Sequence, residues 1–238
     1  MRRDVVGIGV WWRVVVLAAL AGLGAIGGAC IEGGRAHPSG GGSAVRFLAL
    51  GDSFTIGTGG APERSFPARL GERWRTGGCV LELENIAVNG YTTDDLITLE
   101  LPRVATFHPT FVTVAIGAND IVRGSTLDAY RANVRKILET AKASGARVVV
   151  IPQPDWSQSP TAASFGTPDA LAASIGRFNA ALAEEAAKQG AEWVDLVPLM
   201  HDQAAKRQLA SDGLHPSGEA YDAWAAELSR VLKSPCPR

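Results

Sequence analysis

Residues 45–53 read VRFLALGDS, an apolar run that stops at a glycine and is followed at once by two polar residues. Residues 111–120 repeat the pattern as FVTVAIGAND. Short apolar runs ended by Gly or Pro are typical of strands in a parallel sheet that is covered on both faces. The two stretches therefore predict buried strands, each with polar side chains placed where the strand ends.

Three further segments extend this pattern along the chain. Residues 80–88 (VLELENIAV), 147–151 (RVVVI) and 192–197 (EWVDLV) are expected to be strands. Between or after them, residues 127–141, 171–182 and 221–231 place apolar side chains at helical spacing, with caps predicted at Ser125-x-x-Asp128 and at Ser217. Strands that alternate with helices predict one doubly wound α/β domain over residues 44–238, whose ligands bind at the carboxyl ends of the strands.

Composition and charge exclude two classes of protein. The chain has 238 residues, of which 46% are hydrophobic and 20% charged, so a disordered protein is excluded. Its 23 Lys and Arg balance 24 Asp and Glu, a net charge of −1. A protein that neutralises a phosphate backbone needs a basic excess, so nucleic acid is not expected as a partner.

The first 43 residues read as a leader and a linker. Met1-Arg2-Arg3 is basic, residues 14–26 are apolar and uncharged, and small residues lead to Cys30, which together predict a secretory signal peptide over residues 1–29. The apolar run is shorter than the ~20 residues of a membrane-spanning helix. Gly-rich residues 31–43 are typical of a flexible tether.

Cys30 resembles the lipidated cysteine of bacterial lipoproteins, with one departure. Gly27 stands where the lipobox usually has Leu, Val or Ile. The resemblance implies an exported protein with lipidated Cys30 and linker over residues 30–43, anchored to the membrane of the cell envelope. The alternatives are a cysteine present by chance in a signal sequence, which gives a secreted protein, or in an uncleaved anchor; Arg2-Arg3 weakly suggests twin-arginine export.

Four polar segments follow strands or precede the last helix, and the fold places all of them on one rim. They are Gly51-Asp52-Ser53, Asn89-Gly90, residues 117–120 (GAND) and residues 212–216 (DGLHP). Together they supply the groups for acyl transfer: Ser53 as nucleophile, His215 as its base and Asp212 as the group that orients the imidazole. The Ser53 N–H, the Gly90 N–H and the Asn119 side-chain amide are the expected oxyanion donors.

Each segment alone has an ordinary structural interpretation. Gly-Asp-Ser and Gly90 are common in turns, Asn119-Asp120 fits a helix cap, and Asp212-x-x-His215 fits a capped loop. Their joint occurrence, each at the end of a strand or before the last helix, favours a catalytic site.

On these blocks the chain resembles the SGNH hydrolases, also called GDSL esterases and lipases, from Val45 to its end. The resemblance implies a flavodoxin-like three-layer α/β/α sandwich with a five-stranded parallel sheet. It implies the same roles for Ser53, Gly90, Asn119, Asp212 and His215. Phe54 stands where the family usually has Leu, a position expected to affect packing only.

Rival chemistries lack their motifs. No Gly-x-Ser-x-Gly elbow of an α/β-hydrolase occurs, and neither the histidines nor the cysteines show metal-ligand spacing, so neither metal nor cofactor is expected. His108 and His201 are expected to be a structural and a surface residue. The long loop over residues 152–168 offers Trp156 and Phe165, which either line a substrate pocket or only pack the loop down.

The sequence thus predicts an exported, monomeric serine esterase for carboxylic esters or thioesters (lipid, aryl or acyl-sugar), working through an acyl-enzyme. Two alternatives remain: an acyltransferase that uses the same site, and a surface lipoprotein without activity. If Cys30 carries lipid, Cys79 and Cys236 remain in an oxidising compartment. Cys79 precedes the second strand and Cys236 follows the last helix, so both fall at the amino end of the sheet and a disulfide between them is predicted.

Overall fold

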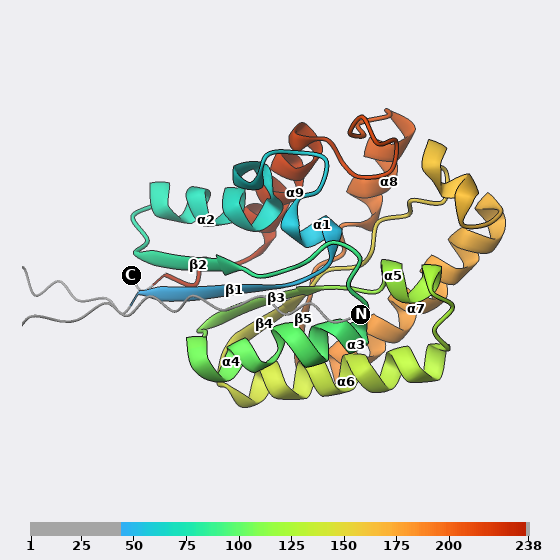
Figure 1. Ribbon diagram of the computed structural model, residues 1–238. Coiled ribbons are helices and arrows are strands. Elements are labelled where there is room, and N and C mark those ends of the chain that lie inside the picture. The colour runs from blue at the N-terminus through green and yellow to red at the C-terminus, as the bar shows by residue number, and fades with distance from the viewer. Residues whose placement is uncertain (1–43, 237–238) are drawn as a thin grey trace, which may run out of the picture. The chain divides into compact units, whose positions relative to one another are not determined.

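Figure 1 shows the computed structural model, which describes residues 44–236. Contacts divide the chain into two units, residues 1–40 and 41–238, and every described element belongs to the second. The predicted signal peptide, Cys30 and the linker lie outside the described residues. Within residues 44–236, no helix has the length and apolar content needed to cross a membrane.

Five parallel strands form one sheet in the order β2-β1-β3-β4-β5. This is the flavodoxin-like order of doubly wound sheets, in which β2 is added on one side of β1 and β3, β4 and β5 are added on the other. The α/β class and the parallel sheet predicted from the sequence are confirmed. The strands are β1 (Val45–Gly51), β2 (Leu81–Asn85), β3 (Phe111–Ala115), β4 (Arg147–Val150) and β5 (Glu192–Trp193).

Helices cover both faces of the sheet. In Figure 1, α2 and α9 lie above it, and α3, α4 and α6 lie below. The described helices are α1 (Ser53–Ile56), η1 (Pro62–Arg64), α2 (Phe66–Thr76), α3 (Thr93–Asp95), η2 (Leu96–Glu100), α4 (Pro102–Phe107), α5 (Ala118–Val122), α6 (Leu127–Ala143), η3 (Pro160–Ser164), α7 (Pro168–Lys188), α8 (Val197–Ala205) and α9 (Gly218–Val231). The three-layer sandwich follows from this arrangement.

Strand alternation builds a separate core on each face. In β1, Phe47 and Ala49 contribute to the core under α2 and α9, whereas Leu48 and Leu50 contribute to the core over α4 and α6. All four side chains are fully buried. Because a central parallel strand is covered on both sides, its sequence is almost wholly apolar, and in residues 45–50 only Arg46, which is half-buried, departs from that pattern.

Two predicted strands are shorter in the structure. Residues 80–88 contribute only Leu81–Asn85, and residues 192–197 contribute only Glu192–Trp193. Both lie at the edges of the sheet, where a strand pairs on one side only. The apolar residues in these two segments continue past the residues that pair. Val80 and Val88 are exposed, and Val197 already begins α8.

One of the two predicted helix caps is at the expected residue, and the other is one residue further along the chain. Ser217 caps α9 by accepting a hydrogen bond from the Ala220 N–H. The predicted capping box at Ser125 is wrong: Thr126 caps α6, accepting from the Ala129 N–H. Thr and Ser are both good N-caps, so adjacent candidates are not separated by residue type.

A disulfide joins Cys79 to Cys236, with 5.4 Å between the Cα atoms. Cys79 lies just before β2, and Cys236 follows α9. The bond ties the C-terminal segment to the amino end of the sheet, across 157 residues of sequence.

Replacing both cysteines by serine is expected to lower the free energy of unfolding by about 2–4 kcal/mol, because the cross-link restricts the unfolded chain most when it closes a long loop. Urea unfolding of oxidised wild-type protein and of Cys79→Ser/Cys236→Ser measures the difference. Equal midpoints, or two free thiols in the oxidised wild type, would contradict the prediction. Ester turnover at 25 °C is expected to be unchanged, because the bond lies at the end of the sheet away from Ser53.

Candidate active site

The polar residues that follow the strands meet at the carboxyl edge of the sheet. Ser53 begins α1 directly after β1, and Asn119 lies in the first turn of α5 directly after β3. Gly90 lies in the loop after β2, and His215 precedes α9. This is the point where the strand order reverses, the usual ligand site of such sheets.

Ser53, His215 and Asp212 form a chain of hydrogen bonds. The Ser53 Oγ lies 2.8 Å from Nε2 of His215, and Nδ1 of His215 lies 2.7 Å from Oδ2 of Asp212. The second contact places the Nδ1 proton toward the carboxylate and leaves Nε2 able to accept a proton from the hydroxyl. This is the geometry by which a serine hydroxyl becomes a nucleophile.

Asp212 is held in its ionised form. Burial raises the pKa of this carboxyl, but hydrogen bonds from the Leu214 N–H, the His215 ring and the His215 N–H outweigh it, so the pKa is lowered overall. The N–H groups of Leu214 and His215 lie 2.9 and 3.0 Å from its Oδ1. One carboxylate oxygen thus folds the loop while the other orients the imidazole.

Three N–H donors line the space beside Ser53. Within residues 44–236, the backbone N–H groups of Ser53 and Gly90 donate to no other protein atom. The Asn119 Nδ2 donates one hydrogen to the Tyr91 carbonyl at 3.0 Å, which leaves the second free. Gly90 has φ +80°, a conformation that favours glycine. The arrangement offers donors for a negatively charged oxygen.

The sharp turn from β1 into α1 depends on its glycine and its buried acids. A Cβ on Gly51 would lie 2.3 Å from the Ala115 carbonyl oxygen, so any larger residue would separate β1 from β3. Asp52, fully buried, caps α1 by accepting from the Phe54 N–H, and burial raises its pKa to about 7. Glu100, on the π-helical turn η2, accepts from the Gly51 N–H at 2.9 Å.

The pKa of Glu100 changes when the protein folds. Burial and the neighbouring Asp52 raise its pKa from 4.5 to about 8, against the opposing hydrogen bond from Gly51. Between these two pH values the folded protein keeps a proton that the unfolded chain has lost. The stability that this proton contributes is complete below pH 4.5 and is lost as the pH rises through 8.

Glu100→Gln is therefore expected to become more stable, relative to wild type, as the pH rises from 5 to 8, by up to about 1.4 kcal/mol per pH unit. Glutamine keeps an oxygen for the Gly51 N–H and carries no titrating group. Urea unfolding at several pH values measures the difference, and Glu63→Gln, at an exposed glutamate, is the control. A difference between Glu100→Gln and wild type that does not change with pH would contradict the prediction.

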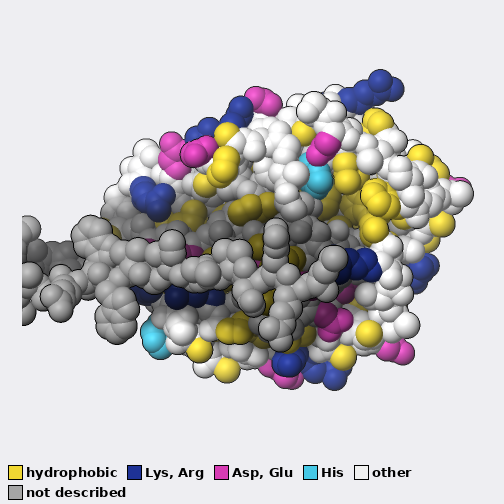
Figure 2. Space-filling view, in the orientation of Figure 1, with side chains coloured by type: hydrophobic (Ala, Val, Ile, Leu, Met, Phe, Trp, Pro, Cys, Tyr) yellow, Lys and Arg dark blue, Asp and Glu magenta, His cyan; other side chains and the backbone are white. Residues whose placement is uncertain are grey.

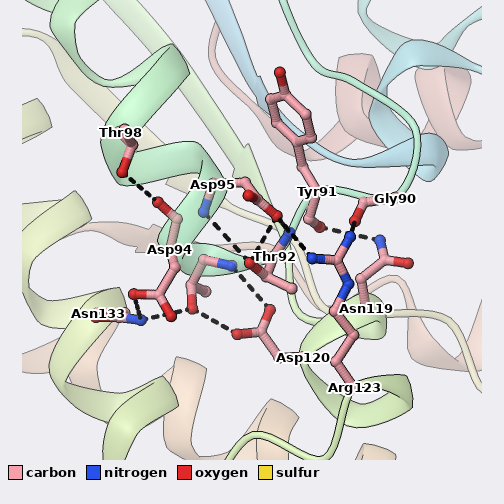
Figure 3. Close-up of polar contacts among 11 residues, drawn as sticks. Gly90, Tyr91, Thr92, Asp94, Asp95, Thr98, Asn119, Asp120, Arg123 and Asn133 are labelled. Carbon is pink, nitrogen blue, oxygen red and sulfur yellow. Dashed lines mark hydrogen bonds and ion pairs between the residues drawn. The ribbon is translucent and has the colours of Figure 1, made fainter.

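A polar network fixes the loop that carries Gly90 (Figure 3). Arg123, just after α5, donates to the Gly90 carbonyl at 2.7 Å and contacts Asp95 at 3.3 Å. Asp120 accepts from both the N–H and the hydroxyl of Thr93. The loop after β2 is thus attached to the same helix that carries Asn119, so the Gly90 and Asn119 donors are held relative to each other before any substrate binds.

The donors and Ser53 share a pocket of about 230 Å³, called here the catalytic pocket. Trp156 and Phe165 both line it; Trp156 is buried and Phe165 is 43% exposed. Their rings also meet edge to face at 6.0 Å, so they contact each other as well as the pocket. Figure 2 has the orientation of Figure 1, and it shows exposed hydrophobic side chains at the end of the molecule where the carboxyl ends of the strands lie.

The two other histidines considered in the sequence, His108 and His201, do not line the catalytic pocket. His108 is exposed and ends α4 with φ +49°, and His201 is exposed on α8. In the described range, no three His, Cys, Asp or Glu side chains are close enough together to hold a metal ion.

Glu100 and Arg123 were not predicted from the sequence. Both act on backbone groups distant in sequence, Gly51 and Gly90, so no short motif marks them. Arg123 has one local signal, its position four residues after Asn119, one helical turn along.

Comparison with known proteins agrees with this geometry. Residues 49–223 match the model of the GDSL-like lipase/acylhydrolase family. The chain is 29% identical over 195 residues to thioesterase 1/protease 1/lysophospholipase L1 of Escherichia coli (strain K12), covering 80% of this chain and 85% of that protein. It is 29% identical over 189 residues to an arylesterase of Vibrio mimicus, covering 77% and 85%.

Among solved structures, that of TesA superposes with a TM-score of 0.66 at 22% identity, covering 79% of this chain and 98% of TesA. The likeness shows a shared fold. The match to the family model over most of the described domain shows that this chain belongs to the GDSL-like lipase/acylhydrolase family, and together with the thioesterase and arylesterase relatives it identifies the chain as a serine hydrolase that acts on ester bonds.

Proposed function

We propose that Ser53, His215 and Asp212 hydrolyse carboxylic esters or thioesters through an acyl-enzyme. The observation that carries the proposal is the continuous contact from Asp212 through His215 to the Ser53 Oγ, which ends beside three N–H donors. Such a chain activates a hydroxyl at the place where an oxyanion is stabilised.

In the first half-reaction, the Ser53 Oγ attacks the substrate carbonyl carbon while Nε2 of His215 takes its proton. The carbonyl oxygen becomes an oxyanion that accepts from the Ser53 N–H, the Gly90 N–H and Asn119 Nδ2. The intermediate collapses when the bond to the leaving oxygen or sulfur breaks, and the imidazolium returns the proton to that atom. Asp212 stabilises the imidazolium meanwhile and stays ionised.

In the second half-reaction, water takes the place of the alcohol. His215 removes a proton from the water as it attacks the acyl-enzyme, and then gives it to the Ser53 Oγ as the acid leaves. An alcohol in place of water gives acyl transfer with the same groups.

The proposed substrates are carboxylic esters or thioesters of the cell envelope or its surroundings. The relatives, a thioesterase/lysophospholipase and an arylesterase, support this class of substrate. We expect p-nitrophenyl esters to be hydrolysed with a burst of one p-nitrophenol per chain where deacylation limits the rate. A fluorophosphonate is expected to add once, and peptide mass mapping locates the adduct on Ser53. An adduct elsewhere, with activity lost, would overturn the assignment of the nucleophile.

Export and lipidation of Cys30 remain part of the proposal and rest on the leader sequence alone. Expression of the full chain and of Cys30→Ser in a bacterial host, followed by detergent phase partition, tests them. Wild type is expected in the detergent phase with the mass of a diacylglyceryl chain, and Cys30→Ser in the aqueous phase. Equal partition of the two proteins would refute lipidation.

A further inference from the structure

A second, larger cavity lies next to the catalytic pocket. It has a volume of about 370 Å³ and is called here the side cavity. Three segments surround it: the loop after β4, helix α8 with the residues that follow it, and the loop before α9. Met200 and Trp224, both buried, contribute to its wall from α8 and α9.

The two cavities meet at three residues. Phe54, Trp156 and Leu214 line both the side cavity and the catalytic pocket. The Phe54 ring lies 5.2 Å from the His215 ring. The Trp156 indole N–H has no hydrogen-bond partner within residues 44–236. The side cavity therefore adjoins the pocket that holds Ser53, and the residues common to both are apolar apart from the indole N–H.

The chemistry of the reaction decides which part of the substrate lies toward the side cavity. The imidazolium of His215 must return its proton to the leaving atom, so the leaving group lies on the histidine side of Ser53. The residues on either side of His215, Leu214 and Pro216, line the side cavity, as does Gly213. Gly90 and Asn119, the oxyanion donors, line the catalytic pocket and are not part of the side cavity.

We propose that the side cavity binds the alcohol or thiol part of the substrate, and that this part is a bulky, neutral and largely apolar group. The acyl part then lies in the catalytic pocket, toward Val122 and Phe165. This inference rests on the proposed function, since it needs Ser53 as nucleophile and His215 as proton donor. It makes the leaving group, rather than the acyl chain, the main determinant of specificity.

The size and lining of the cavity set the class of group. Because a cavity of about 150 Å³ holds benzene, the volume of the side cavity suits about a dozen non-hydrogen atoms. Gln203, in the wall, already accepts from the Trp224 indole N–H and donates to the Ala220 carbonyl. Asp155 and Arg207 contribute one charge of each sign, which favours no ionised ligand. A bicyclic aromatic alcohol fits these conditions.

The test places a larger side chain from α8 in the side cavity and measures kcat/KM for two series of esters. Ala204 lines the cavity and is half-buried, so Ala204→Phe places a ring in it; Ala205→Phe, at an exposed lining residue, is a second variant should the first fail to fold. His201→Phe, an exposed α8 position outside the lining, is the matched control. The first series keeps the acetyl group and changes the alcohol from ethanol to 2-naphthol. The second keeps ethanol and lengthens the acyl chain.

Filling the cavity is expected to lower kcat/KM for 2-naphthyl acetate by at least about tenfold and to leave ethyl acetate within about twofold. His201→Phe is expected to match wild type on both. In Ser53→Ala protein, quenching of tryptophan fluorescence by 2-naphthol is expected, and is expected to be lost when Ala204→Phe is added.

Three results would overturn the inference. They are an equal loss on both acetates, a loss confined to ethyl esters of long acids, and no loss at all. Each is distinct from failure of the proposed function, in which wild-type protein hydrolyses none of the esters.

Discussion

Ser53→Ala is expected to lower kcat for ester hydrolysis by about 10⁵–10⁶-fold while the protein remains folded, because no other group takes the place of the nucleophile. Within residues 44–236 the Oγ makes one hydrogen bond, to His215, so its removal disturbs little else. Initial rates with p-nitrophenyl acetate measure the loss, and thermal unfolding checks the fold.

Ser157→Ala is the matched control. Ser157 is also buried, and its hydroxyl has no hydrogen-bond partner within the described residues. This variant is expected to retain wild-type turnover. A Ser53→Ala protein that keeps more than a hundredth of the wild-type rate would overturn the mechanism.

Asn119→Ala is expected to lower kcat by about 10²–10³-fold with little change in KM, because the free N–H of its amide acts on the oxyanion and not on the neutral carbonyl. The same amide also donates to the Tyr91 carbonyl, so a structural effect must be separated from a catalytic one. Asn119→Asp separates them in part, since it keeps the size of the side chain and puts an acceptor where the donor was.

Asn133→Ala is the control for the network of Figure 3. Asn133 donates to Thr93 and Asp94, each at 3.0 Å, and does not line the catalytic pocket. Its loss is expected to lower stability and to leave kcat close to wild type. Equal kcat values for Asn119→Ala and Asn133→Ala would remove Asn119 from the oxyanion hole.

The central strands could be predicted because their signal is local. A strand buried on both faces is apolar along most of its length, as β1 is apart from Arg46 and β3 is apart from Thr113. Edge strands have no such requirement, which explains why residues 80–88 and 192–197 gave the wrong lengths. Helix α2 was not predicted, although Phe66, Leu70 and Trp74 follow one another at four-residue spacing and are buried.

The reacting groups could be predicted because a parallel sheet brings the ends of its strands together, whatever their distance in sequence. What supports them could not. Glu100 lies 49 residues from the Gly51 that it contacts, and Arg123 lies 33 residues from Gly90. Each meets a backbone group, which has no identity in the sequence. The side cavity could not be predicted either. It lies between the loop after β4, helix α8 and the loop before α9, and no periodicity in the sequence shows how these segments pack together.

The two ends of the described domain lie at the same end of the sheet, which has a practical consequence. Val45 enters β1 at the amino end of the sheet, and the Cys79–Cys236 bond holds the other end of the described chain there as well (Figure 1). Ser53 and both cavities lie at the opposite edge. A bead or a fusion partner joined directly at Val45 or at Cys236 is thus attached behind the reactive face, and enzyme immobilised in this way is expected to accept esters as readily as free enzyme.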